Sequence, residues 1–401
     1  MIKVFLRELH RLATTPIYWL NMIVGPIFCA VFFSTMMDSG LPTNLPVGVV
    51  DEDNSVTTRS LIRNLDAFQN TEIVANYASV TEARKAVQHG DIYAFYYIPE
   101  GTTREMQLQH SPTVSFYMNS QFFVAGSLTY RDMRMMSELF GAAASRSVLR
   151  AKGATDGMAM PYLQPIVVDS HPIHNPSLNY SVYLTNVIVP GLLGLFVLFV
   201  TVFGIGSEIK DETADELLLT ASGRTGSEDM ADPTCGKPTL LTSCNALLGK
   251  LLAQGFIFHL VGWTLMLYFY GYQHFPCYGG IPVMMLVMSL FILACQGLGV
   301  LMICALPTLR MGLSFASLWG VLSFSICGMS FPVMAMPAWI QGLSWLFPLR
   351  HYFVLYVNCA LDGYPLYNAF PYVLSLAIFA LLPVFFVRRF GKIMHEVQYV
   401  P

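Results

Sequence analysis

Long stretches without a charged residue dominate the hydropathy pattern of this 401-residue chain. A membrane helix needs roughly 18 or more predominantly apolar residues, and every one of these stretches is longer than that. They lie between Arg11 and Asp38, Asp169 and Glu208, Lys250 and Arg310, Arg310 and Arg350, and Asp362 and Arg388. The pattern predicts an α-helical polytopic membrane protein.

Gly, Pro and charged residues divide these apolar stretches into six predicted transmembrane helices. The predicted helices cover residues 17–37, 181–206, 251–270, 281–306, 311–330 and 370–387. Between the last two, the stretch 331–350 is apolar but interrupted by prolines, so that each piece is too short to cross. We expect a re-entrant or interfacial hairpin there, with its Trp residues at the level of the headgroups.

Residues 1–16 show apolar and charged positions at helical spacing and end at Pro16. One side would carry Val4, Phe5, Leu9 and Leu12, and the other Lys3, Arg7, Glu8 and Arg11. This arrangement predicts an amphipathic helix in the membrane interface. The alternative is a plain basic flank before the first span.

Residues 38–180 have a different pattern, in which short strand-like runs alternate with helical periodicity. Strands are expected over 46–50, 71–77, 92–98 and 114–118, and helices over 57–68, 80–89 and 121–152. Such alternation predicts an α/β domain between the first and second spans. The acidic turn Asp51–Ser55 is explained by helix capping, because no Gly-x-Gly-x-x-Gly follows it.

Basic residues gather on one side of the predicted spans, which places both termini and the 207–250 loop in the cytosol. That side carries Lys3, Arg7, Arg11, Lys210, Arg224, Lys237, Lys250, Arg310, Arg388, Arg389 and Lys392. The α/β domain would then be extracytoplasmic, and residues 388–401 a cytosolic tail. We expect the protein to lie in the bacterial cytoplasmic (inner) membrane and to cross it several times.

No catalytic or cofactor-binding motif accompanies the spans. The sequence has no His-Glu-x-x-His, Gly-x-Ser-x-Gly or Gly-x-x-x-x-Gly-Lys, and no Cys-x-x-Cys. Asp169, His171 and His174 have a metal-like spacing, but the prolines around them predict an extended connector instead. We therefore expect no enzyme activity, no metal or cofactor in this chain, and no nucleic-acid partner.

The loop between the second and third spans contains a charged, helix-forming segment. A helix over Glu208–Thr220 would align Ile209, Thr213 and Leu217 along one line with acidic residues beside it. A partner groove can bind the apolar line while the charges set the register. The alternative is a solvated amphipathic loop, and the Gly- and Ser-rich stretch 223–242 is expected to be a flexible spacer.

The ordered set of features resembles the permease subunits of the ABC-2 family, the exporters with the type V fold, and within it the YhhJ/YbhR/YbhS-type bacterial permeases. In that family the same loop carries a coupling helix that contacts the ATPase, with a closing Gly-Lys before the third span. The positions that match are Glu208, Asp211, Glu212, Thr213, Glu216, Leu217, Leu218, Thr220, Gly249 and Lys250. The chain departs from the pattern at Glu212, where the family has Gly, and in the stretch 223–242.

The resemblance implies an ABC exporter permease that moves a hydrophobic or lipid-like substrate outward. Its partners would be a cytosolic ATPase that binds ATP and Mg, a second permease, and, as a further candidate, a periplasmic adaptor. The implied ATPase contacts are Glu208, Ile209, Asp211, Glu212, Thr213, Glu216, Leu217 and Leu218. The competing hypothesis is a membrane receptor or scaffold whose external domain binds a ligand or an envelope partner.

Overall fold

The computed structural model describes residues 1–108, 110–164, 169, 171, 175, 179–223 and 239–397. The chain divides into two units, Ser39–Pro172 and the combination of Met1–Asp38 with Ile173–Pro401. We call them the α/β unit and the membrane unit, and describe each by itself. His174 and most of the stretch 223–242 lie outside the described residues, whereas His171 is exposed and contacts Asp169 through Nε2 and Oδ2 at 3.0 Å.

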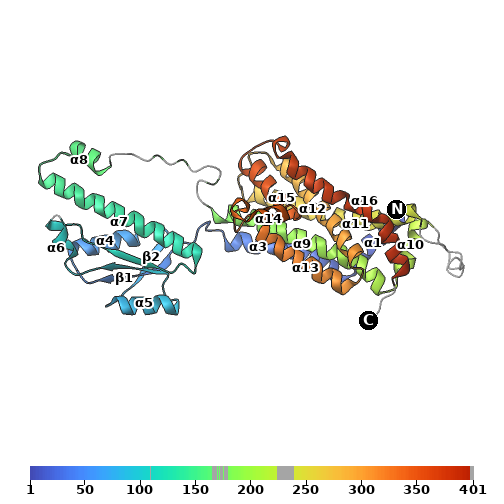
Figure 1. Ribbon diagram of the computed structural model, residues 1–401, viewed down its shortest axis with the longest axis horizontal. Helices are drawn as coiled ribbons and strands as arrows, with labels where there is room; N and C mark the ends of the chain where they lie inside the picture. Colours follow the sequence, from blue (N-terminus) through green and yellow to red (C-terminus); the bar gives the residue numbers. More distant parts are fainter. Residues whose placement is uncertain are drawn as a thin grey trace. The chain divides into compact units, whose positions relative to one another are not determined.

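The α/β unit is built on a four-stranded sheet with the order β2-β1-β3-β4 (Figure 1). Parallel pairing joins β1 to both β2 and β3, while β4 runs antiparallel to β3. The strands are β1 Leu45–Asp51, β2 Thr71–Asn76, β3 Ala94–Ile98 and β4 Ser115–Met118. Each lies within a few residues of the strand that the sequence predicts.

Both faces of the central strand β1 are covered by helices. Val47 and Val49 pack with residues of α4 and α7 on one face, whereas Val50 packs with α5 on the other. This alternation is the period of two that a strand imposes on its side chains. The helices of the unit are α4 Val56–Asp66, α5 Val80–His89, α6 Thr102–Gln107, α7 Phe123–Ala151 and α8 Asp156–Leu163.

The acidic turn after β1 starts α4, as the capping explanation predicts. Ser55 and Thr58 form a capping box, in which each side chain binds the backbone N–H of the other. The buried Asp51 carboxylate accepts hydrogen bonds from the backbone N–H of Asp53 and Asn54, and from the Thr58 hydroxyl at 2.8 Å. The polar groups of this turn are therefore satisfied locally.

The membrane unit is helical throughout its described residues. Its elements are α1 Ile2–Thr14, α2 Pro16–Trp19, η1 Leu20–Val24, α3 Gly25–Met36, α9 Tyr180–Lys210, α10 Ala214–Ser222, α11 Leu240–Met266, η3 Leu267–Tyr272, α12 Ile281–Ala305, α13 Leu309–Ile326, η4 Val333–Ala335, α14 Ala338–Ser344, α15 Pro348–Leu355, η5 Tyr356–Leu361, η6 Leu366–Ala369 and α16 Phe370–Glu396. Within the described part, six helices are long and apolar enough to cross a membrane.

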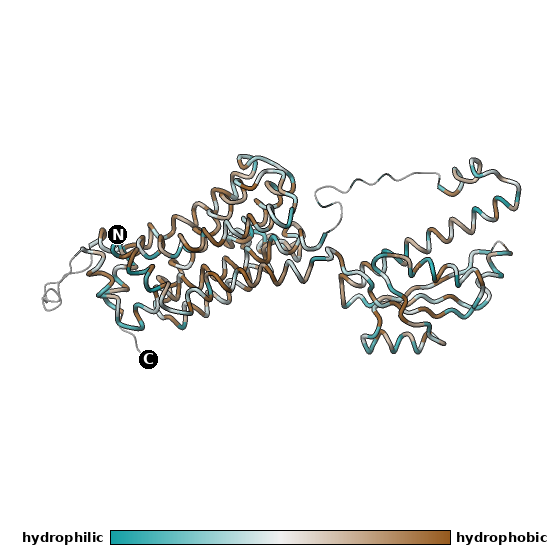
Figure 2. Tube along the Cα trace, turned by 180° about the vertical axis from the view of Figure 1, so that it is seen from behind, coloured by the Kyte–Doolittle hydropathy of each residue, from teal (hydrophilic) through white to brown (hydrophobic). Residues whose placement is uncertain are grey.

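The six long helices differ in how much of their apolar surface the unit encloses. In α9 and α12 the most apolar windows are 67% and 72% buried, whereas those of α13 and α16 are only 22% and 17% buried. Apolar residues dominate the long helices, and polar residues concentrate at the end that holds α1 (Figure 2). The unit therefore has a core of α9 and α12, and outer helices whose exposed apolar faces suit lipid or another protein.

Several helices extend beyond the predicted spans. α11 begins at Leu240, so residues 240–250 are helix rather than loop, and α16 continues to Glu396 into the expected tail, whose residues 398–401 lie outside the described ones. The α16 extension carries charged side chains, and the α11 extension carries polar ones and ends at Lys250, but the helical hydrogen bonding continues through both. The hairpin at 331–350 consists of short helices separated by prolines and continues through α15 to Leu361.

Candidate functional site: a buried charge cluster and a neighbouring pocket

Three charged side chains meet with no exposed surface where α1, the end of α9 and the start of α11 come together. The Lys250 Nζ donates to Glu8 Oε2 at 2.6 Å and to Glu208 Oε1 at 2.8 Å, and the exposed fraction of all three side chains is 0%. Buried charges are tolerated only when they are paired. The contacts of Lys250 with both carboxylates therefore join three helices that are distant in the sequence.

Two arginines of α1 complete the set around Glu208. Arg7 donates to both oxygens of the Glu208 carboxylate, at 3.0 and 3.2 Å. Arg11 pairs with the same carboxylate and donates to the Ser207 hydroxyl at 2.9 Å. We call Arg7, Glu8, Arg11, Glu208 and Lys250 the charge cluster. Burial alone lowers the pKa of Arg7, but its bond to Glu208 and the nearby carboxylates raise that pKa above its ordinary value, so Arg7 stays charged.

The sequence of α1 places Glu8 on the inner side of its helix. Val4, Glu8 and Leu12 are spaced by four residues and all are buried against the unit. The prediction that Glu8 lies on the outer, polar side is therefore wrong. The α1 surface that faces α11 is apolar at its ends and carries a carboxylate in the middle, where Lys250 and Gln254 supply its hydrogen bonds.

Two glycines let the helices approach closely enough for these contacts. A Cβ at Gly249 would lie 2.7 Å from the Cβ of Val4, and a Cβ at Gly204 would lie 2.5 Å from Nε2 of Gln254. Gly249 has no room for a methyl group, because the atoms opposite it belong to the branched Val4 side chain, whereas the atom opposite Gly204 is the end of the flexible Gln254 side chain. The structure thus explains the pair Gly249-Lys250. Gly249 leaves room for α1 to pack against α11, and the Lys250 side chain reaches the Glu8 carboxylate.

Residues Asp211–Thr213, which we call the elbow, separate α9 from α10. α9 continues to Lys210, Glu212 has a φ of 56°, and α10 begins at Ala214. The backbone N–H of Thr213 donates to the Glu208 carbonyl at 3.0 Å, and its hydroxyl contacts the Glu208 carboxylate. The prediction of one helix over Glu208–Thr220 is therefore wrong, since a left-handed residue breaks it.

The break divides the eight predicted contact residues into two groups. Glu208, Ile209, Leu217 and Leu218 are buried, whereas Asp211, Glu212 and Glu216 are exposed and Thr213 is half-buried. The apolar side of α10 packs against α1, α11 and α16. No partner can reach those leucines without displacing α10, so the surface open to a partner is the acidic side.

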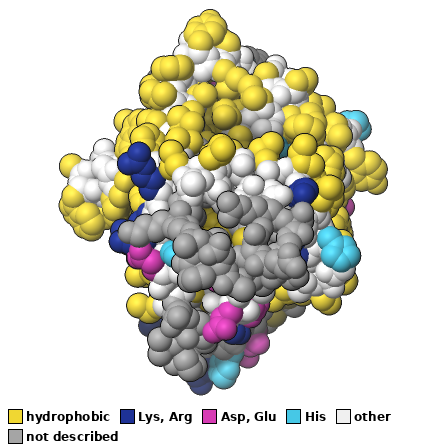
Figure 3. All heavy atoms as spheres, turned by 90° about the vertical axis from the view of Figure 1, so that its right-hand side faces the viewer, with side chains coloured by type: hydrophobic (Ala, Val, Ile, Leu, Met, Phe, Trp, Pro, Cys, Tyr) yellow, Lys and Arg dark blue, Asp and Glu magenta, His cyan; other side chains and the backbone are white. Residues whose placement is uncertain are grey.

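Charged side chains are concentrated at this end of the membrane unit. Figure 3 shows Lys, Arg, Asp and Glu side chains gathered on that face, with apolar side chains above and beside them. Glu216 and Asp211 extend the charge cluster toward the surface, at 3.7 Å from Arg7 and 4.0 Å from Arg11. The elbow thus lies between a buried set of ion pairs and an exposed acidic surface.

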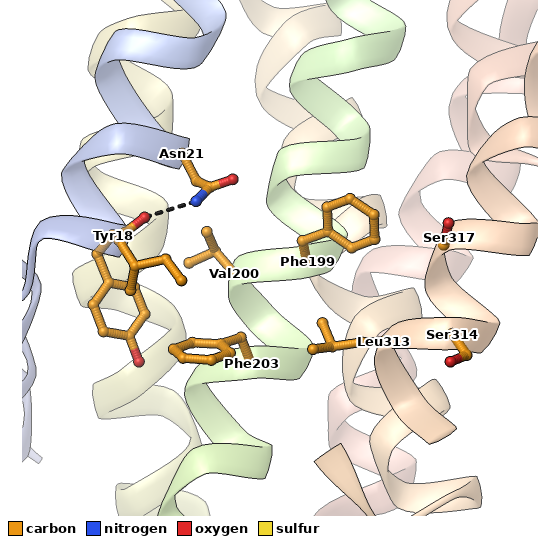
Figure 4. Close-up of a pocket in the computed structure, with 9 residues that line it drawn as sticks. Tyr18, Asn21, Phe199, Val200, Phe203, Leu313, Ser314 and Ser317 are labelled. Atoms are coloured by element: carbon orange, nitrogen blue, oxygen red, sulfur yellow. Dashed lines mark hydrogen bonds between the residues drawn. The ribbon is translucent and has the colours of Figure 1, made fainter. Parts of the chain in front are cut away.

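A pocket of about 580 Å³ lies beside the cluster, between α2–η1, α9 and α13 (Figure 4). Its wall is aromatic and aliphatic, with a carboxamide and hydroxyl groups as the polar contribution. The lining residues are Ile17, Tyr18, Asn21, Phe199, Val200, Phe203, Leu313, Ser314 and Ser317. A pocket of this size and lining suits an uncharged or amphipathic small molecule.

Among the described residues, no set of three or more His, Cys, Asp or Glu is positioned to hold a metal ion. The cluster carboxylates are occupied by ion pairs and are closed to solvent. The arrangement is suited to transmitting force between helices and to binding an apolar molecule.

Sequence comparisons identify the family of the chain. The profile of the ABC-2 family transporter proteins matches residues 16–225 and 237–387. The "Probable multidrug ABC transporter permease YbhR" of Escherichia coli K12 is 23% identical over 335 residues, which are 82% of each chain. The protein of the same name from Escherichia coli O157:H7 matches equally well. The chain therefore belongs to the ABC-2 family of transporter proteins.

Proposed function

We propose that the chain is the permease subunit of an ABC exporter in the bacterial inner membrane. Both termini and α10 would face the cytosol, and the α/β unit the opposite side. A cytosolic ATPase subunit would bind Mg and ATP and hydrolyse the ATP. A second permease of the same or similar sequence would complete the complex. Family membership supports the permease role, and the distribution of basic residues supports the orientation.

The observation that carries the proposal is the attachment of α10 to the rest of the unit. The charge cluster ties α1, α9 and α11 together directly in front of the elbow, and the apolar side of α10 is buried against the same helices. Movement imposed on α10 is therefore transmitted to the long helices instead of being absorbed by a loose loop. We assign the ATPase contact to the exposed acidic residues Asp211, Glu212, Asp215 and Glu216, which need a basic groove on the partner.

ATP-driven closure of two ATPase subunits would displace two α10 helices together. Because α9 and α11 are linked through Glu208 and Lys250, both helices would follow the displacement. The wall of the pocket belongs partly to α9, so the same displacement reshapes the substrate site. The lining favours hydrophobic or amphipathic small molecules, including lipid-like ones.

Co-purification with the cognate ATPase tests this assignment. Glu212→Lys with Asp215→Lys reverses two exposed charges and leaves both the charge cluster and the buried side of α10 intact. We expect at least a tenfold loss of ATPase binding. Glu396→Lys is the matched control, because it reverses an exposed charge on α16, and it should bind ATPase like the wild type.

Wild-type binding by the Glu212→Lys, Asp215→Lys variant would refute the assignment of the contact to the acidic side of the elbow and α10. Substitutions at Leu217 and Leu218 are unsuitable for this test. Their exposed fractions are 0% and 8%, so polar replacements would detach α10 from the unit whether or not it contacts an ATPase.

A further inference from the structure

Tyr18 lies at the boundary between the pocket and the charge cluster. Its ring lines the pocket and packs edge-on against Phe203, with ring centroids 5.5 Å apart and an interplanar angle of 67°. Its exposed fraction is 1%, although its sequence neighbours Ile17 and Trp19 are each 45% exposed. The side chain is therefore inserted between α2 and α9 rather than resting on the surface.

The hydroxyl group of Tyr18 points away from Asn21 (Figure 4). It makes no hydrogen bond within the part of the chain that the structure describes. The Ser207 hydroxyl lies close to it, and Arg11 and Glu208 of the charge cluster are within electrostatic reach. Ser207 already accepts from Arg11. A buried hydroxyl without a partner is unfavourable, and this one lies beside the Ser207 hydroxyl, whose oxygen can accept a hydrogen bond from it.

We propose that Tyr18 is a positioning residue that transmits occupancy of the pocket to the charge cluster. An uncharged aromatic molecule in the pocket presses on the Tyr18 ring, which moves against Phe203. The hydroxyl then donates to Ser207 and turns that side chain away from Arg11, so Arg11 loses its hydrogen bond to Ser207 and keeps its contacts with Glu208 and Asp211. The elbow and α10 are loosened as a result. This inference rests on the proposed function, because it states how a bound substrate signals to the ATPase contact.

Two other buried tyrosines, away from the pocket, serve as structural comparisons for Tyr18. Tyr270 and Tyr352 also have buried hydroxyls without a hydrogen-bond partner among the described residues. Neither lines the pocket. Tyr352 packs with Phe291 at a centroid distance of 5.0 Å in the core of the unit. Removal of its hydroxyl is a control for loss of a buried polar atom alone.

The test places an aromatic group in the pocket covalently, so that no natural ligand has to be known. Ser317 lines the pocket, whereas the next residue, Leu318, is 57% exposed and does not. Ser317→Cys and Leu318→Cys are made in full-length protein whose native cysteines are replaced. Both are reacted with N-phenylmaleimide and reconstituted in lipid nanodiscs without ATPase. Hydrogen exchange of the backbone amides over Ser207–Ser222 is then measured by mass spectrometry.

We expect the label at position 317 to raise exchange in this segment at least fivefold, and the label at 318 to change it less than twofold. Tyr18→Phe should reduce the response at 317 to under twofold, while Tyr352→Phe retains it. Size-exclusion profiles verify that each variant is folded.

An unaltered response in Tyr18→Phe overturns the inference, as does the absence of any response in the parent protein or an equal loss in Tyr352→Phe. Since no ATPase is present, these outcomes are separate from a failure of the ATPase-binding test.

Discussion

Each unit has a buried carboxylate near the C-terminal end of an apolar element. The two carboxylates differ in how far along the sequence their hydrogen-bond partners lie. Asp51 ends β1 and is followed by a turn and α4, and Glu208 lies near the end of α9 before the elbow and α10. Asp51 accepts hydrogen bonds from residues at most seven positions away. Glu208 is bound by side chains that are 201, 197 and 42 positions away.

Asp51 therefore serves as a local helix cap, whereas Glu208 connects elements that are far apart in the sequence. The Asp51 hydrogen bonds start one helix and require nothing from the rest of the chain. The Glu208 ion pairs require α1, α9 and α11 to be in place together, so a force on any one of them reaches the others. We expect substitutions at the two sites to differ both in size and in how far their effects extend.

Removal of the shared cation should have the largest effect. Lys250→Met leaves the Glu8 carboxylate buried without its cation and weakens the pairing of Glu208, and breaking a buried pair in this way costs about 3–5 kcal/mol. We expect a fall of about 10 °C in the unfolding temperature of detergent-solubilised protein. The control is Lys392→Ala, whose pair with Glu396 is exposed, and its unfolding temperature should stay within about 1 °C of wild type.

The close approach of α1 and α11 can be tested with a single methyl group. Gly249→Ala puts a Cβ at 2.7 Å from Val4, which should destabilise the protein by about 1–3 kcal/mol. Gly141→Ala on α7 meets nothing within 4 Å and should stabilise by up to about 1 kcal/mol through helix propensity. Thermal unfolding of both variants shows whether each substitution raises or lowers the stability of the protein. Equal effects at the two positions would mean that α1 does not pack here.

Loss of the local cap should remain local. Asp51→Ala removes three hydrogen bonds and should destabilise the α/β unit by about 1–2 kcal/mol. Native-state hydrogen exchange of the full-length chain should show faster exchange in β1 and α4 and unchanged exchange in α9 and α11. Accelerated exchange in α11 as well would contradict the contrast between the two carboxylates.

The elbow should tolerate, and even favour, glycine at its left-handed position. Glu212 has a φ of 56°, which is unfavourable for a residue with a Cβ by about 1 kcal/mol. Glu212→Gly should therefore raise stability by up to about 1 kcal/mol. Glu216→Gly, the same substitution inside α10, should lower it by a similar amount. Changes of opposite sign in the unfolding temperatures of the two variants would support the break between α9 and α10.

The same contrast explains which parts of the structure could be predicted from the sequence. The four strands, the helices α4, α5 and α7 and the cap at Asp51 follow from periodicity and from neighbours in the chain, and they were predicted, whereas the short helices α6 and α8 were not. The charge cluster was not, because no local signal shows that Glu8, Glu208 and Lys250 meet. A partial signal existed in α1, where Glu8 is spaced by four residues from both Val4 and Leu12.

The elbow was missed for a different reason. Helix propensity and apolar spacing both favour continuing the helix through Glu212, because a Glu gives no signal of a left-handed position whereas a Gly would. The break is stabilised by Thr213, which bonds back to Glu208. The polarity pattern placed Asp211, Glu212 and Glu216 at the surface, as the structure does, but it also expected Glu208, Ile209, Leu217 and Leu218 to be accessible to a partner, and these four are buried.

The affinity of the cognate ATPase for charge-exchanged permeases tests the central claim most directly. Lys250→Glu puts three carboxylates together in the cluster, and Glu8→Lys with Lys250→Glu restores a cation–carboxylate pair between α1 and α11, with Arg7 and Arg11 still paired to Glu208. With monodisperse protein in nanodiscs, we predict at least a tenfold weaker Kd for the single variant and recovery to within about threefold of wild type for the exchanged pair. Wild-type affinity in the single variant would show that ATPase docking does not depend on the charge cluster.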